Sequence, residues 1–157
     1  MNKSKRTAII AGMSVLCVGS AATGMTSAAE MDAKQVTIAA KALGFLTTKA
    51  PAGAKVVVTA GAAPVAAVQA ALPGAAVAAG DAAPGAYAVF VSSAAEGKKA
   101  LAKGTVTVGN DVACVDAGGC VIAVETTPKV TIYVSKAAAS AAGVEFDPNF
   151  KMMVTEK

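Results

Sequence analysis

The chain has 157 residues, a formal net charge of +4 at pH 7, and neither His nor Trp. Without an imidazole it lacks the commonest general base and metal ligand, which excludes most familiar catalytic arrangements. No cationic stripe with interleaved aromatic residues occurs, so nucleic-acid binding is excluded as well. The length suits a single domain with a modest core.

The first 29 residues have the three parts of a secretory signal peptide. A basic stretch at residues 2–6 precedes an apolar run at residues 7–18, and small residues end the segment at Ser27-Ala28-Ala29. The apolar run is too short to span a bilayer, and no later segment is both long enough and free of helix breakers. We therefore expect cleavage before Glu30, a single periplasmic or secreted domain at residues 30–157, and no direct membrane insertion.

Removal of the leader changes the charge and the cysteine count. Eleven Lys then face ten acidic residues, which gives a net charge of +1, and the only Arg is lost. Cys17 follows Leu16 instead of the small residue of a lipoprotein signal, so we expect it to leave with the leader. Cys114 and Cys120 remain, and an even pair in an oxidising compartment predicts a disulfide. A redox or metal-binding pair is the alternative, but neither a C-x-x-C spacing nor a His supports it.

The remaining chain alternates apolar, β-branched runs with helical segments that have capping residues at their ends. The expected helices lie at residues 34–46, 64–71, 94–103 and 135–142, with a final helical turn from 147, and the expected strands lie at 55–59, 75–79, 87–91, 105–108, 120–125 and 129–134. Asp32 is the expected cap of the first helix, and Gly143 the left-handed end of the last long one.

This order predicts a three-layer α/β fold whose largely parallel sheet ends in a C-terminal β-hairpin. The Ala-rich stretch at residues 60–86 carries little charge, so we expect it to be ordered and loosely packed. Because Ala fills a core poorly, the few large side chains should carry much of the packing. These are Phe45, Phe90, Tyr133, Phe146 and Phe150.

The densest group of polar acceptors follows the expected strand at residues 105–108. Asn110 and Asp111 lie at the carboxyl end of that strand, where open α/β sheets often bind ligands, and they are candidate ligand-binding residues. The preferred interpretation of this group is a plain turn. Gly118-Gly119 is interpreted as a flexible turn beside the disulfide, because no phosphate-loop Gly-Lys-Ser/Thr follows. Ser92-Ser93 is interpreted as a helix cap, because no nucleophile motif surrounds it.

A series of motifs in the second half occurs in a recognisable order. It comprises the strand at residues 105–108, Cys114, Gly118-Gly119-Cys120, the strand at 130–135, the helix end at Ala142-Gly143, and Asn149-Phe150-Lys151-Met152. Over about fifty residues this series resembles the YfiR-like periplasmic domain family. The first half fits only in outline, because Ala50-Pro51 stands where that family has Trp-Pro.

The resemblance implies a small α/β domain like half of a periplasmic solute-binding protein. It also implies a non-enzymatic regulatory role, because relatives bind and restrain the periplasmic part of a membrane-bound sensor or diguanylate cyclase and thereby influence biofilm formation. We expect an apolar patch at the end of the chain to bind that partner. Its candidate residues are Phe146, Phe150, Met152 and Met153, and their packing on the core is the alternative.

The second hypothesis is a periplasmic small-ligand or metal carrier that uses the edge near Asn110 and Asp111, and an enzyme is the third. Association into a homodimer also stays open. The thioethers of Met152 and Met153 could hold copper, but adjacent side chains on a helix point in different directions. The sequence therefore predicts no catalytic residue, no cofactor and no metal site.

Overall fold

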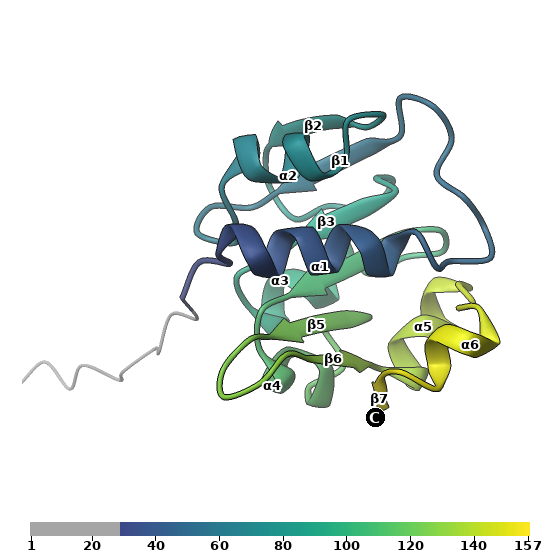
Figure 1. Cartoon of the computed structure of the whole chain (residues 1–157). Helices are drawn as coiled ribbons and strands as arrows, with labels where there is room; N and C mark the ends of the chain where they lie inside the picture. Colours follow the sequence, from purple (N-terminus) through teal and green to yellow (C-terminus); the bar gives the residue numbers. More distant parts are fainter. Residues whose placement is uncertain (1–28) are drawn as a thin grey trace, which may run out of the picture.

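The computed structural model describes residues 29–157, so the predicted leader, except for Ala29, lies outside the described part. The elements in chain order are α1 (Ala33–Leu43), β1 (Lys55–Val58), α2 (Val65–Ala71), β2 (Ala76–Ala79), β3 (Ala88–Phe90), α3 (Ala94–Ala100), β4 (Val106–Gly109), α4 (Val112–Asp116), β5 (Ile122–Glu125), β6 (Thr131–Val134), α5 (Lys136–Ala142), α6 (Pro148–Lys151) and β7 (Thr155–Glu156). They form an α/β fold around one open sheet (Figure 1).

The seven strands follow the order β2-β1-β3-β4-β5-β6-β7. Strands β2, β1, β3, β4 and β5 are parallel to one another, β6 pairs antiparallel with β5, and β7 runs parallel to β6. This arrangement confirms the predicted largely parallel sheet and its hairpin. The two-residue β7 was not predicted, because so short a segment has no pattern of its own and is ordered by its pairing with β6.

Side-chain hydrogen bonds cap the first turn of α1 and attach this helix to the sheet. Asp32 Oδ1 accepts a bond of 2.7 Å from the Gln35 backbone N–H, and Gln35 Oε1 accepts one of 2.9 Å from the Asp32 N–H. This reciprocal pair is a capping box. The Gln35 amide also donates to the Val124 carbonyl at 2.9 Å, which fixes α1 against β5. Asp32 is therefore the cap that the sequence predicts.

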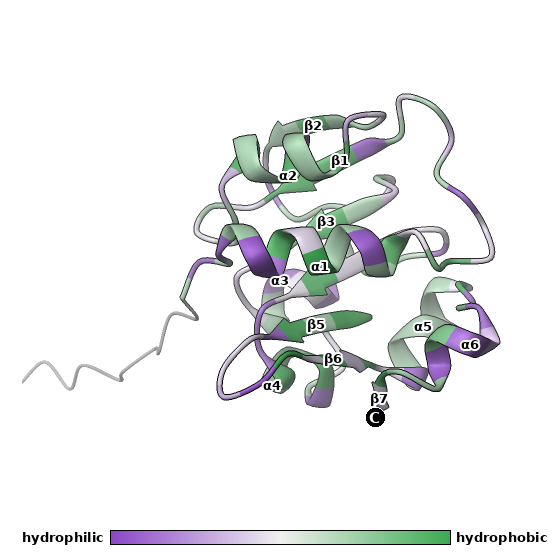
Figure 2. Ribbon diagram, viewed as in Figure 1, coloured by the Kyte–Doolittle hydropathy of each residue, from purple (hydrophilic) through white to green (hydrophobic). Residues whose placement is uncertain are grey.

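Apolar side chains fill both sides of the sheet. One core contains residues of α1, α2, α5 and α6 over one face, and the other contains residues of α3 and α4 over the opposite face. Figure 1 shows α1 crossing in front of the sheet with α3 behind it, which gives three layers. Hydrophilic residues interrupt α1 and α6, whereas β5 is largely hydrophobic (Figure 2). No helix within residues 29–157 is long and apolar enough to cross a membrane.

The five aromatic residues expected in the core do not all lie there. Phe90, Phe146 and Phe150 are buried, but Tyr133 is partly exposed and Phe45 is 39% exposed. Phe45 follows the end of α1 and stacks one ring face on Phe150, with 4.9 Å between the ring centroids. Phe45 is therefore not a core residue, whereas Tyr133 is partly exposed and packs against the core on the α3 and α4 side of the sheet.

The expected plain turn after β4 is also different. Asp111 begins a helix of five residues, α4, whose length is too short for a periodic apolar pattern to reveal it. The helix expected to end at Gly104 stops earlier, at Ala100.

In the Ala-rich region, β2 forms one edge of the sheet. Gln69 of α2 covers this edge by donating to the Ala75 carbonyl at 3.2 Å and accepting from the Val77 N–H at 3.4 Å.

Candidate functional site

The carboxyl ends of β1, β3 and β4 lie side by side at one edge of the sheet. Strand order reverses between β1 and β3, and ligands in open α/β folds bind at such switch points. A cavity of ≈ 340 Å³ lies beside this point, at the ends of β3 and β4. Its polar lining includes Ser92, Ser93, Asn110 and Asp111. The structure therefore brings the two candidate ligand-binding residues together with the serines that follow β3.

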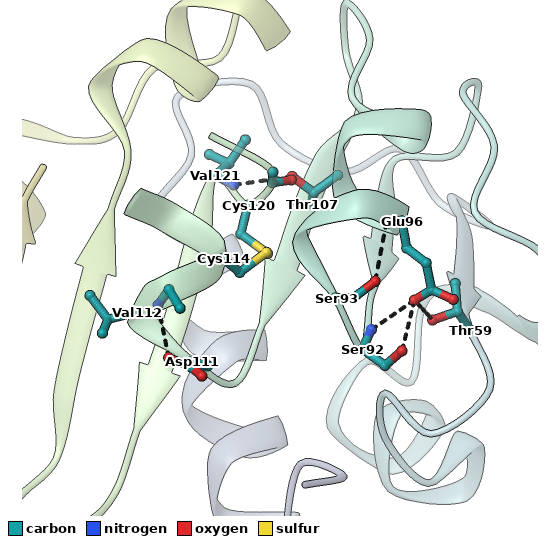
Figure 3. Close-up of a disulfide and its surroundings, with 12 residues drawn as sticks. Thr59, Ser92, Ser93, Glu96, Thr107, Asp111, Val112, Cys114, Cys120 and Val121 are labelled. Atoms are coloured by element: carbon teal, nitrogen blue, oxygen red, sulfur yellow. Dashed lines mark hydrogen bonds between the residues drawn. A yellow bond between two sulfur atoms is a disulfide. The ribbon is translucent and has the colours of Figure 1, made fainter. Parts of the chain in front are cut away.

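Glu96 of α3 connects the ends of β1 and β3. Its Oε2 accepts a hydrogen bond of 2.8 Å from the Thr59 hydroxyl, and two bonds of 2.9 Å from the backbone N–H and hydroxyl of Ser92. Figure 3 shows Glu96 pointing toward both residues. Thr59 is buried, whereas Glu96 and Ser92 are only partly so. Sequence reasoning missed this cluster, because no motif indicates that residues so far apart in the chain meet at one carboxylate.

Opposing effects act on the pKa of the Glu96 carboxyl. Partial burial raises it, whereas the bonds from Ser92 and Thr59 and the charge of Lys99 lower it. The net result is a pKa below the ordinary glutamate value. Glu96 is therefore ionised at neutral pH and accepts hydrogen bonds in that form, which suits a structural anchor better than a general acid or base.

We expect the contribution of Glu96 to stability to depend on pH. Because its pKa is lower in the folded protein, the carboxylate stabilises the fold above the unfolded-state pKa of about 4.3, and this effect is lost as the pH falls through the folded value. Glu96→Gln should therefore be less stable than wild type at neutral pH, and the difference should shrink below about pH 4.3. Urea denaturation of both proteins between neutral pH and acid pH measures this difference in the free energy of unfolding.

Glu145→Gln is the control for this experiment, because Glu145 is exposed on the loop between α5 and α6. It removes the same charge without touching the Thr59–Ser92 cluster. A stability difference for Glu96→Gln that persists unchanged in acid, or that Glu145→Gln shares, would contradict the assignment.

The other polar side chains at this edge of the sheet form hydrogen bonds with the backbone. Ser93 Oγ accepts from the Glu96 N–H at 3.3 Å and caps α3, as the sequence predicts, while Asp111 Oδ1 accepts from the Ala113 N–H at 2.8 Å and caps α4. The Asn110 amide donates to the carbonyl of Ala29, the last residue of the predicted leader. Asp111 is therefore primarily a helix cap, and Asn110 is attached to the start of the described chain.

Cys114 of α4 and Cys120, just before β5, form the predicted disulfide, with 5.2 Å between their Cα atoms. Both residues are buried. The bond lies against Gly109, where a Cβ would come within 2.6 Å of Cys120 Sγ. Its two thiols are consumed in the bond, so the pair serves the fold and offers no free thiolate for catalysis.

The turn that closes this disulfide loop is held by backbone contacts. Gly118 has a φ of +71°, which glycine adopts without strain. Gly119 approaches α3 so closely that a Cβ there would lie 2.4 Å from the Ala94 carbonyl oxygen. The buried Thr107 hydroxyl donates to the Gly119 carbonyl at 2.8 Å and accepts from the Val121 N–H at 3.0 Å (Figure 3). The interpretation of a flexible turn is correct for Gly118, whereas Gly119 is required by close packing.

The four candidate partner-binding residues separate into two pairs. Phe146 and Phe150 are 3% and 2% exposed and pack against each other with ring centroids 5.3 Å apart. Both belong to the core, as the alternative interpretation holds, so neither side chain forms part of a free surface. Met152 and Met153 follow α6 and are 79% and 65% exposed. Only the methionines can contact a partner directly.

Within residues 29–157 no three His, Cys, Asp or Glu side chains lie close enough together to hold a metal ion. No buried side-chain nitrogen or oxygen in this part of the chain lacks a hydrogen-bond partner. No family model matches this chain, and no curated protein or solved structure matches it.

Proposed function

We propose that this chain is an exported, non-enzymatic regulatory module that binds the periplasmic domain of a membrane-bound sensor or diguanylate cyclase. The observation that carries the proposal is a gathering of exposed apolar side chains around α6. Three of the four large hydrophobic residues exposed within residues 29–157 lie there. They are Phe45, Met152 and Met153, which we call the C-terminal patch.

Contacts with α6 hold the patch together. Phe45 stacks on Phe150, and its carbonyl accepts a 2.9 Å bond from the Asp147 N–H at the start of α6. Met152 follows the helix directly, and the Met153 N–H donates to the Phe150 carbonyl at 2.9 Å. The exposed Phe45 ring therefore contacts the buried ring of Phe150, and the two exposed methionines directly follow the helix that carries Phe150. Flexible methionines next to a rigid core helix support an adaptable docking surface.

The resemblance to the YfiR-like family supplies the kind of partner. Its motifs include the residues of α5 and α6, the same region as the patch. The likeness to half of a solute-binding protein is part of this proposal and agrees with the open parallel sheet. The intramolecular bonds of Glu96, Ser93 and Asp111 support a non-enzymatic role, because the polar side chains at the carboxyl edge are already engaged.

We expect Met152→Ser/Met153→Ser to lose partner binding. Removal of two apolar contacts should weaken it by at least about tenfold, equivalent to about 1.4 kcal/mol. Affinity capture of the tagged mature protein from cell envelopes measures this, and cyclic dinucleotide levels in a deletion strain report the regulatory effect. Because both methionines are exposed, the melting temperature should not change.

Val130→Ser is the matched control, because Val130 is 46% exposed and lies in the β5–β6 turn, away from α6 (Figure 1). It should retain the partner. Equal capture by the double variant and wild type, or an unchanged second messenger in the deletion strain, would contradict the proposal.

A small-ligand carrier is the second candidate, and the ≈ 340 Å³ cavity at the carboxyl edge favours it. Cleavage before Glu30 would remove Ala29, the hydrogen-bond partner of the Asn110 amide, and release that amide toward a ligand. A small molecule that co-purifies with the mature protein and is lost from Asn110→Ala would support this function. An empty mature protein would oppose it.

A further inference from the structure

A second cavity of ≈ 400 Å³ lies at the opposite edge of the sheet, at the amino ends of the strands. Lys55 begins β1, and Tyr87 and Thr105 immediately precede β3 and β4. The α1–β1 loop, which Figure 1 shows curving around this end of the molecule, contributes Lys49, and the α3–β4 loop contributes Lys103. The cavity shares no residue with the carboxyl-edge cavity or with the C-terminal patch.

All charged side chains that line this cavity are positively charged. Lys49, Lys55 and Lys103 line it, and no Asp or Glu does. The ion pairs within residues 29–157 join Lys136 to Glu156 and Lys157 to Asp116, so none involves the three lysines of the cavity. Three lysine side chains line one hollow, and their like charges would attract an anion bound there. In a mature chain of net charge +1 this is a local concentration of positive charge.

Two of these lysines are held in position by the fold. The Lys49 ammonium donates to the Gly44 carbonyl at the end of α1. The Lys103 stem lies beside Gly143, where a Cβ would be 3.4 Å from Lys103 Cγ. The rest of the lining is mixed, since the buried Thr105 supplies a hydroxyl while Leu46, Pro51 and Val144 supply apolar contacts.

The geometry points to this cavity as a binding site for a small organic phosphate, held by Lys49, Lys55 and Lys103. Its volume lies within the range of ligand pockets, and its apolar wall accommodates the uncharged part of such a molecule. The mature chain has no Arg, so Lys supplies the positive charge of this site, and Lys binds phosphate as a point charge. The site is independent of the proposed partner surface, so either can fail without the other.

Calorimetric titration of the mature protein with phenyl phosphate at low salt tests the site. We expect binding with a Kd of about 1 mM or tighter, weakening as salt is added. Lys49→Gln/Lys55→Gln/Lys103→Gln should bind at least tenfold more weakly. Phenyl phosphate should also raise the melting temperature of wild type, but not that of the triple variant.

Lys34→Gln/Lys98→Gln/Lys129→Gln is the matched control, because it removes three exposed lysines that do not line the cavity. It should bind phenyl phosphate as wild type does. Single variants of the cavity lysines, each expected to weaken binding, replace the triple variant if that protein does not fold. No binding to wild type, an equal loss in the control, or citrate binding as tightly as phenyl phosphate would overturn the proposal.

Discussion

Gly97→Ala should lower the free energy of unfolding by about 1–3 kcal/mol, the usual cost of inserting a methyl group into a packed interior. Gly97 lies inside α3, where helix propensity alone would predict a gain of about 1 kcal/mol from alanine. The tertiary contact reverses that sign, because a Cβ at Gly97 would lie 2.1 Å from the Gly119 carbonyl oxygen. The clash is with backbone, so either α3 or the Gly118-Gly119 turn must move. Urea denaturation measures the difference.

Gly74→Ala is the control for this substitution. A Cβ at Gly74 would meet no atom within 4 Å, and the residue has no positive φ. Its replacement should leave stability unchanged or raise it by up to about 1 kcal/mol, because alanine restricts the unfolded chain. If Gly97→Ala proved as stable as wild type, the close approach of α3 to the turn would be refuted.

Loss of the Cys114–Cys120 disulfide should cost roughly 2–2.5 kcal/mol on the chain-entropy model, because the two residues are separated by only six positions. For a domain of this size the melting temperature should fall by about 5–10 °C. A thiol assay on denatured protein should find no free thiol in mature protein before reduction and two afterwards. Thermal unfolding with and without reductant then gives the size of the effect.

Cys114→Ala/Cys120→Ala provides the control, since reductant should have no effect on its melting temperature. The variant itself should melt near the temperature of reduced wild type. Two reactive thiols in freshly isolated, unreduced protein would contradict the structural role and favour redox or metal chemistry for this pair.

The sequence predicts the elements whose signals are local. Asp32 is recognisable as a helix cap because its side chain bonds to a backbone group three residues away. Gly143 is recognisable as a helix end, and its φ of +63° is the left-handed conformation that the pattern indicates. The β5–β6 hairpin follows from two β-branched runs separated by a turn. In each case the decisive interaction lies within a few residues or is repeated along a strand.

The candidate sites were less predictable. Carboxyl ends of parallel strands gather by topology, so the location of Asn110 and Asp111 could be inferred, but not that Asp111 would cap a five-residue helix. At the end of the chain, composition alone could not separate the buried Phe150 from the exposed Met153. Helix α6 has four residues, too few for an apolar periodicity to identify its buried side.

The sequence by itself determined most of the alternation of helices and strands, the caps of the predicted helices and the pairing of the two cysteines that follow the predicted leader. The tertiary structure alone decided which residues meet across the fold. Glu96 accepts a hydrogen bond from Thr59 across 37 positions, Gly97 contacts Gly119, and three lysines from separate segments line one cavity. The physical reason is that caps and strand patterns depend on neighbours along the chain, whereas these contacts depend on strand order and on how closely α3 packs against the turn that closes the disulfide loop.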